Sequence, residues 1–364
     1  MIWSSMDDQE PAGAVDASAH DLFEQPEDWT DPGLYPVAPG VYRIPLPLPQ
    51  DGLVAVNVYA IETDDGLVLI DGGWALELSR QRLDAALERV DRHVRDITRF
   101  LITHVHRDHY TQAVALRREF PARISVGRGE RPTLELLTSG EFRSLEPQHQ
   151  QLQRAGAEPL LRELVNVGLG PERKSSQRWE MPDDWLDAPS VIGLPGGPDL
   201  EVLHCPGHTQ GHVVFVDRQA ELLFAGDHVL PHITPSIGYE ASPGELPLND
   251  YLASLRMMLA LPDLRLLPAH GPVTTSVHAR VNELLQHHED RLAACLAAAG
   301  EGAGTAYAAA KVLSWTRRRR RFEDLHPFNR MLATIETQSH LDVAAAQGCL
   351  TRTEVDGVTH YVPS

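Results

Sequence analysis

Cysteine is scarce in this sequence, which has only Cys205, Cys295 and Cys349 among its 364 residues. Three scattered thiols form no disulfide framework, a pattern typical of a protein in a reducing compartment. The chain also lacks any run of about eighteen apolar residues, so no membrane span is expected. Its first residues lack the basic start and the apolar core of a secretory signal. These absences predict a cytoplasmic protein with no membrane association.

Positive charge is scarce as well. The chain has 32 Lys and Arg residues against 51 Asp and Glu residues, which gives a formal net charge of −19. Such a charge opposes the long-range attraction to phosphates on which general nucleic-acid binding depends. Residues 1–32 are acidic and contain no Lys or Arg, so this segment cannot bury enough apolar surface to order itself. We expect a flexible tail there, or an arm draped over the surface.

The remaining composition is that of a soluble globular protein, with 42% hydrophobic and 23% charged residues. This length suits one large domain, or a large domain and a small one. In the first part of the chain, Leu53–Ile61 and Leu67–Ile70 are β-rich runs separated by a turn at Asp64–Gly66, which predicts a β-hairpin. Apolar residues from Leu76 to Val90 recur at helical spacing, and a further strand follows.

Three histidines and an aspartate lie within six residues directly after that strand. His104 and His106 alternate with Val105, so both imidazoles leave the same face of an extended chain. Asp108 and His109 follow where the chain turns towards a helix. Imidazole nitrogens and carboxylate oxygens are ligands that suit zinc, iron and manganese. This spacing at the end of a strand predicts a metal site.

The second half of the chain repeats the arrangement of a polar residue after a strand. His208, Asp227 and His270 each stand just past the end of a predicted β-run, beside Gly or Pro. Loops at the edge of a rigid scaffold can bring residues that are distant in sequence to one place. We therefore expect these three side chains to join the first cluster.

These motifs, in this order, resemble those of the metallo-β-lactamase superfamily. The matching stretches are Thr103–His109, Pro206–Thr209, Gly226–Asp227 and Ala269–Gly271, with Asp71–Gly73 in support. The resemblance spans roughly residues 35 to 290. It implies an α/β protein with the αββα fold, in which two β-sheets pack face to face between helices and two metals lie at one edge.

The resemblance also implies a role for each candidate residue. One metal would be bound by His104, His106 and His208, the other by Asp108, His109 and His270, and Asp227 would bridge the two. Asp108 and Asp227 are therefore the candidate catalytic residues, Asp108 because it could orient the nucleophile or pass on its proton. His212 and Asp71 lie outside the ligand pattern, and we expect them to orient the ligands.

The expected activity is that of a dinuclear metal hydrolase acting on a small-molecule substrate. Two cations about 3.5–4 Å apart convert a shared water into hydroxide near neutral pH. This bridging hydroxide would attack a small ester, thioester or lactone. Zinc, at two ions per chain, is the expected cofactor, and the same ligands are compatible with iron or manganese. The common zinc β-lactamases carry cysteine where Asp227 stands here, so penicillin hydrolysis is not expected.

Two other activities remain open from the sequence. The same metal centre suits a phosphodiesterase or ribonuclease, and mononuclear iron sulfur dioxygenases share much of the motif. Metal analysis separates the second alternative, because about one iron per chain with oxygen uptake indicates dioxygenation and about two metals without it indicate hydrolysis. Hydrolases of quorum-signal lactones resemble this pattern but place a tyrosine shortly after the bridging aspartate, where this chain has His228; Tyr239 follows in the next loop.

The chain is expected to divide into a catalytic domain at 33–285 and a C-terminal module at 286–364. Within the first, about residues 125–195 form a helical insertion that is well placed to act as a lid. Helices followed by a hairpin at Asp356–Gly357 make the module similar to the winged-helix module of one branch of the superfamily. Arg317–Arg321 could contact phosphates, but the charge balance disfavours nucleic-acid binding. We expect the module to pack against the sandwich or to form a homodimer.

Overall fold

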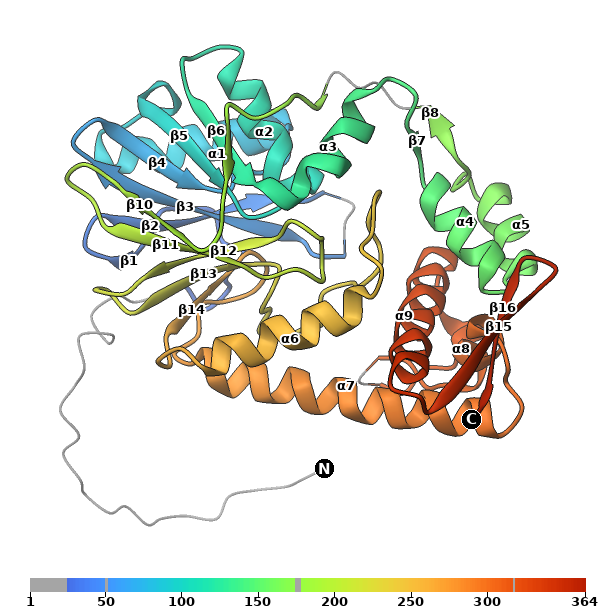
Figure 1. The fold of residues 1–364 in the computed structure, drawn as a ribbon. Coiled ribbons are helices and arrows are strands. Elements are labelled where there is room, and N and C mark those ends of the chain that lie inside the picture. The colour runs from blue at the N-terminus through green and yellow to red at the C-terminus, as the bar shows by residue number, and fades with distance from the viewer. Residues whose placement is uncertain (1–24, 50–51, 174–177, 317) are drawn as a thin grey trace, which may run out of the picture.

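The computed structural model describes residues 25–49, 52–173, 178–316 and 318–364. Within these residues, two β-sheets pack face to face between helices (Figure 1). The first sheet consists, in spatial order, of β1 (Tyr35–Ala38), β2 (Val41–Pro47), β3 (Ala55–Thr63), β4 (Gly66–Ile70), β5 (Ile97–Ile102), β6 (Arg123–Gly127) and β9 (Asp184–Leu186). The second consists of β10 (Ser190–Gly193), β11 (Asp199–His204), β12 (Val213–Asp217), β13 (Leu222–Gly226) and β14 (Arg265–Pro268).

Strand β4 shows why the central strands are apolar along their whole length. Leu67 and Leu69 belong to the core between the first sheet and its covering helices. Val68 and Ile70 belong to the core between the two sheets. Because successive side chains point to opposite faces and both faces are covered, every position is apolar. Strands β3 and β4 pair antiparallel, which confirms the predicted hairpin.

Helices cover the outer face of each sheet. Helices α1 (Glu77–Leu87) and α2 (Arg107–Arg117) lie on the first sheet and share its apolar core. Helices α6 (Pro247–Leu259) and α7 (Val277–Gly300) lie on the second. Helix α3 (Arg131–Thr138) follows β6. The layers are helix, sheet, sheet and helix (Figure 1), so the αββα prediction is confirmed.

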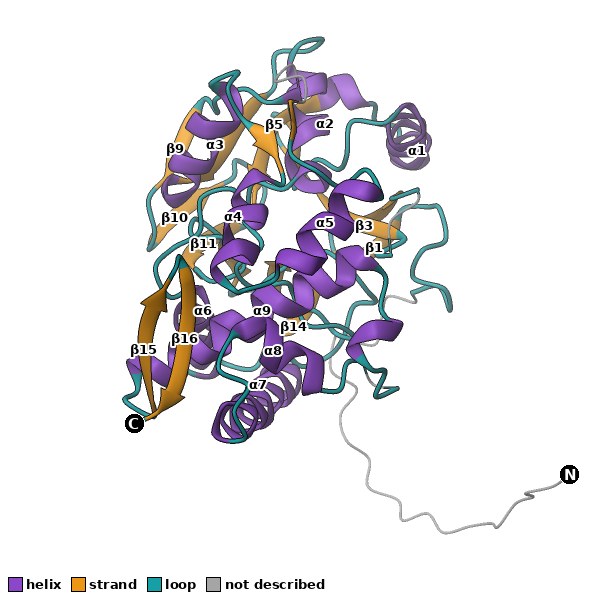
Figure 2. Cartoon of the chain, turned by 90° about the vertical axis from the view of Figure 1, so that its right-hand side faces the viewer, coloured by secondary structure: helices purple, strands orange, loops and turns teal. Residues whose placement is uncertain are grey.

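A second group of packed helices, with a β-hairpin, lies beside the sandwich (Figures 1 and 2). It joins the inserted helices α4 (Glu146–Arg154) and α5 (Glu158–Asn166) to α8 (Ala306–Val312), α9 (Pro327–Ala346) and the hairpin of β15 (Leu350–Val355) and β16 (Val358–Pro363). Leu152 and Leu161 of the insertion share one apolar core with Ile335 and Tyr361 of the C-terminal part. The insertion that was predicted to be lid-like is thus packed onto the C-terminal module.

The inserted segment also differs locally from the sequence prediction. The pattern predicts helix from Leu152 to Val165, whereas the structure has two helices separated near Gly156. Gly156 has φ of +74°, a left-handed conformation that ends a helix and that glycine adopts without steric cost. A short two-stranded sheet of β7 (Arg143–Ser144) and β8 (Glu172–Arg173) connects this insertion to the sandwich.

The C-terminal hairpin predicted around Asp356–Gly357 is present as β15 and β16. Helix α9 is largely buried, with Met331 and His340 fully covered. Arg318–Arg320 lie on an exposed turn, and Arg317 lies outside the described residues. The assignment of this module as a winged helix stays a prediction.

The predicted tail or surface arm spans residues 1–32, of which residues 1–24 lie outside the described residues. Residues 25–32 lie on the sandwich, because Arg43 donates hydrogen bonds to the Gln25 side chain and to the Trp29 carbonyl. All three cysteines are free thiols, as predicted. None of the helices in the described part of the chain has the length and apolar character that a membrane crossing requires.

Candidate metal centre

The predicted site residues all follow the ends of strands at one edge of the sandwich. His104 and His106 lie between β5 and α2, and Asp108 and His109 lie in the first turn of α2. The other three come from the second sheet and follow β11, β13 and β14, in that order: His208, Asp227 and His270. The fold therefore brings together all seven residues that the sequence predicted.

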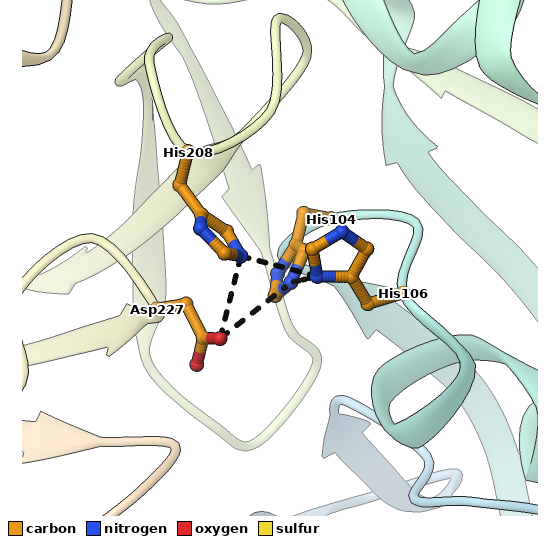
Figure 3. A group of neighbouring side chains, drawn as sticks. All are labelled: His104, His106, His208 and Asp227. Carbon is orange, nitrogen blue, oxygen red and sulfur yellow. Dashed lines mark hydrogen bonds and ion pairs between the residues drawn. The ribbon is translucent and has the colours of Figure 1, made fainter. Parts of the chain in front are cut away.

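The seven side chains form two groups. In the first, His104, His106, His208 and Asp227 point towards one another (Figure 3), and their ligand atoms lie within 4.8 Å of each other. In the second, the ligand atoms of Asp108, His109 and His270 lie within the same distance. Each group has the spacing and the oxygen and nitrogen atoms that could hold one cation.

Asp227 faces both groups with different oxygen atoms. Its Oδ2 lies 3.4 Å from His208 Nε2 and 3.9 Å from His104 Nε2. Its Oδ1 lies 3.3 Å from His270 Nε2 and 3.7 Å from His109 Nε2. A carboxylate so placed can contribute one oxygen to each of two cations.

The outer nitrogens of His208 and His270 determine which tautomer each imidazole adopts. His208 Nδ1 donates to the Ser236 carbonyl and His270 Nδ1 donates to the Ala55 carbonyl, each at 2.8 Å. Because a carbonyl oxygen only accepts, Nδ1 must carry a proton, and in the neutral imidazole Nε2 then presents its lone pair to the site. This is the tautomer that a metal-binding imidazole needs.

Three buried ligand atoms have no hydrogen-bond partner among the described residues: His109 Nε2, His270 Nε2 and Asp227 Oδ1. Buried polar atoms are costly unless they are paired, and most in folded proteins have a partner. A cation in each group would satisfy these three atoms together. The residues therefore fit zinc, iron or manganese, whose usual ligands are imidazole and carboxylate.

The imidazoles of the His208 group and the carboxyl of Asp108 are in the protonation states that suit cation binding. Burial lowers the pKa of His106 to about 3 and that of His208 to about 4, so both imidazoles are neutral. Burial would raise the pKa of Asp108, but the imidazoles of His109 and His270 hold it well below its usual range. Neutral imidazoles and an ionised carboxylate are the forms that bind a metal.

Asp71, which the sequence predicts to orient ligands, lies behind His109 of the second group. Its carboxylate accepts from the Thr103 amide at 2.8 Å and faces His109 Nδ1 at 2.9 Å. Burial would lower the pKa of His109, but the carboxylates of Asp71, Asp108 and Asp227 raise it to about 10, so a cation that binds His109 must displace a proton from it. A carboxylate behind a ligating histidine fixes its ring and makes it a better ligand.

Replacing Asp71 by asparagine is expected to weaken cation binding by the second group. The variant removes the negative charge behind His109, and outer partners of this kind are worth about 10–100-fold in metal affinity. Titration with zinc against a competing chelator measures the change. An exposed aspartate of the sandwich, Asp199, provides the control as Asp199→Asn. Unchanged affinity in Asp71→Asn would contradict the supporting role.

His212, the other predicted orienting residue, contacts two of the predicted ligands. Its ring stacks on His104, with centroids 4.9 Å apart, and its Nε2 accepts from the Asp227 amide at 3.2 Å. Its position agrees with the prediction that it orients ligands. Two further histidines lie beside the motifs: His204 is exposed and contacts the Gln210 carbonyl, whereas His228 is buried beside Tyr251.

Two buried glutamates next to the site were not predicted from the sequence. Glu130 accepts a hydrogen bond from the Thr209 hydroxyl, directly after His208. Glu240 accepts from the Gln210 amide at 3.1 Å and from the Thr133 hydroxyl at 3.2 Å. Both glutamates lie far in sequence from the residues around His208 and belong to no motif, so only the fold reveals them.

Because of these two carboxyl groups, we expect the free energy of unfolding to depend on pH in an unusual way. Burial raises the pKa of Glu130 to about 7, and burial together with the charge of Glu130 raises that of Glu240 to about 9, from an ordinary value of 4.5. A carboxyl with a raised pKa stabilises the fold fully below pH 4.5 and loses this contribution as pH rises through the folded pKa. The free energy of unfolding of the wild type should therefore fall between about pH 5 and 9.

In Glu240→Gln, the free energy of unfolding should fall less over this pH range than it does in the wild type, because glutamine does not ionise. The difference between the two falls should be on the order of a few kcal/mol. Chemical denaturation at a series of pH values measures the difference. Glu135→Gln, an exposed position on α3, is the matched control and should follow the wild type. Parallel curves for wild type and Glu240→Gln would contradict the raised pKa.

Known proteins are similar to this chain in sequence and in fold. A family model described as the metallo-beta-lactamase superfamily matches residues 51–270. The chain is 25% identical over 318 residues to a probable metallo-hydrolase of Bacillus subtilis (strain 168), covering 85% of this chain and 92% of that protein. It is 28% identical over 222 residues to a hydroxyacylglutathione hydrolase of Haemophilus influenzae, covering 59% of this chain and 84% of that protein.

Among solved structures, a metallo-beta-lactamase family protein from Thermus thermophilus matches with a TM-score of 0.73 and 26% identity. The match covers 90% of this chain and 100% of that one. The family match includes more than half of the chain and all seven of the clustered side chains. The chain therefore belongs to the metallo-beta-lactamase superfamily, as its motifs predicted, and it is a metal-dependent hydrolase.

Proposed function

We propose that this hydrolase cleaves a small thioester, ester or lactone with two divalent cations, and that both cations are zinc. The observation that carries the proposal is the orientation of Asp227, whose two oxygens face the two ligand groups separately. In this proposal His104, His106 and His208 hold one cation, Asp108, His109 and His270 hold the other, and Asp227 contacts both. Zinc suits these ligands and is a strong Lewis acid without redox chemistry.

When bound, two such cations lower the pKa of a water shared between them and polarise the carbonyl oxygen of the substrate. The residues of the chain supply the remaining requirements. Asp227 faces both ligand groups and so holds them at a fixed separation. The buried imidazoles exclude bulk water from the inner side of the site. Asp108 is partly exposed and lies 3.4 Å from His270, so its ionised carboxylate can accept a hydrogen bond from the attacking water and orient it.

A thioester is the favoured substrate within this class. The similar protein of Haemophilus influenzae is named a hydroxyacylglutathione hydrolase, a name that describes a thioester of glutathione as its substrate. Thioesters also need less stabilisation of the leaving group than esters or lactones do, because a thiol with pKa of about 8.5 leaves readily as its anion. Esters and lactones present the same carbonyl and remain within the proposal.

Metal content and turnover on one preparation of the full chain test this proposal. We expect about two zinc ions per chain, and hydrolysis of an S-acylglutathione that stops with a chelator and returns with zinc. A phosphodiester panel and an oxygen electrode are the controls. Turnover of phosphodiesters alone would replace the proposal by a phosphodiesterase or ribonuclease. About one iron per chain with oxygen uptake would replace it by a sulfur dioxygenase.

A further inference from the structure

The segment Ser236–Ser242, here named loop 236–242, lies next to His208 and Gln210. The Ser236 carbonyl accepts from His208 Nδ1 at 2.8 Å. Further along, the Glu240 carboxylate accepts from the Gln210 amide at 3.1 Å, and the Ser242 carbonyl accepts from the Gln210 side chain. The loop is thus bonded to the ligand itself and to the residue two positions after it.

The opposite side of the same loop is bonded to the inserted helix α4. Gln151 Nε2 donates to the Gly238 carbonyl at 3.1 Å, and Gln148 Nε2 donates to the Glu240 carbonyl at 3.0 Å. Gln148 is buried, and Gln151 is half-buried. Both amides therefore reach the loop from a rigid helix that is not part of the sandwich.

Helix α9 of the C-terminal module holds the loop from a second direction. The Tyr239 ring packs edge to face on Phe328, with centroids 5.8 Å apart. A β-carbon at Gly238 would lie 3.1 Å from both Ile335 and Ser339, so the loop backbone is in close contact with the helix. Aromatic pairs and tight packing of this kind restrict the positions that a loop can adopt.

Loop 236–242 forms no helix or strand, so its carbonyls depend on these side chains for their hydrogen bonds. A carbonyl that sets the tautomer and direction of an imidazole must itself be held in place. We infer that Gln148 and Gln151 are positioning residues for the metal centre, which act through loop 236–242 on His208. The inserted helix and the C-terminal module then have a shared role, which is to brace one ligand. The inference rests on the proposed function, because it requires His208 to bind a cation.

Helix α4 itself offers the matched control. Gln150 and Gln153 lie on the same helix and are exposed, and neither donates to the loop. The test compares Gln148→Leu/Gln151→Leu with Gln150→Leu/Gln153→Leu. Both double variants exchange two glutamines for a similar volume at nearly equal helix propensity. Only the first leaves the Gly238 and Glu240 carbonyls without their side-chain donors.

Cobalt(II) titration of the metal-free full chain provides the readout, because the absorption of bound cobalt reports its ligands without any substrate. His208→Ala identifies the binding step that belongs to the His208 group. In Gln148→Leu/Gln151→Leu we expect this step to weaken about tenfold, the lower end of the range for outer partners, with an altered spectrum. The other step and both steps of the control variant should be unchanged.

Phe328→Ala removes the ring contact between loop 236–242 and α9 and should weaken cobalt binding by the His208 group in the same way. This variant therefore tests the inference even if the glutamine variant folds poorly. Circular dichroism and thermal unfolding establish folding for every variant. If both variants are folded and bind cobalt as the wild type does, the positioning role is wrong. A wild type that binds no cobalt would overturn the proposed function as well, so the two failures are distinct.

Discussion

Asp227→Ala is expected to lose both cations and nearly all turnover. The two oxygens of Asp227 face the two ligand groups, at 3.4 Å from His208 and 3.3 Å from His270, so the alanine variant loses a contact to each group. Loss of metal removes several kcal/mol of transition-state stabilisation. About 4 kcal/mol corresponds to roughly a thousandfold in rate, which we expect as the minimum.

Metal content by mass spectrometry and turnover of the best substrate measure this result together. Asp199→Ala, at an exposed strand position, is the control and should keep both cations. Asp227→Asn separates charge from shape, because the amide retains the size of the side chain but is a weaker ligand. Full turnover in Asp227→Ala would refute the bridging role and with it the dinuclear proposal.

Gly211→Ala is expected to produce the largest loss of stability, about 3 kcal/mol, among the substitutions near the site. A β-carbon at Gly211 would overlap the backbone of Glu130 and of Gly129, and a β-carbon at Gly129 would lie 2.7 Å from the Gly211 Cα. Backbone atoms on both sides cannot move as a flexible side chain can. The loop that carries His208 would have to shift instead.

The free energy of unfolding, from chemical denaturation of the metal-free protein, measures this effect. Gly300→Ala at the end of α7 is the control, because nothing in the described part of the chain lies within 4 Å of its added carbon. That change should be neutral or stabilising by less than about 1 kcal/mol. Equal stabilities for the two variants would contradict the close approach at Gly211.

Strands and the residues after them were predictable because their signals are local. The turn Asp64–Gly66 between two β-rich runs was enough for the hairpin, and alternation was enough to place His104 and His106 together. The break at Gly156 was missed because the apolar spacing continues through it. Only the left-handed conformation of that residue shows where one helix ends and the next begins.

The contacts behind the ligands were not predictable, because their partners are distant and chemically ordinary. Glu130 meets Thr209 across 79 positions, and Gln151 meets Gly238 across 87. A glutamate or glutamine in isolation carries no signal of burial. Their roles depend on which backbone groups the fold leaves in need of a partner.

The sequence alone determined which side chains are candidate ligands, because each follows the end of a strand and can be identified from a short motif. Folding alone decided how they face one another: which oxygen of Asp227 turns to which group, and which nitrogen of His208 keeps its proton. Those choices depend on carbonyls such as that of Ser236, which belongs to a loop whose Gly238 and Glu240 carbonyls accept hydrogen bonds from helix α4. Local sequence specifies the chemistry of a group, but its direction in space is a property of everything that surrounds it.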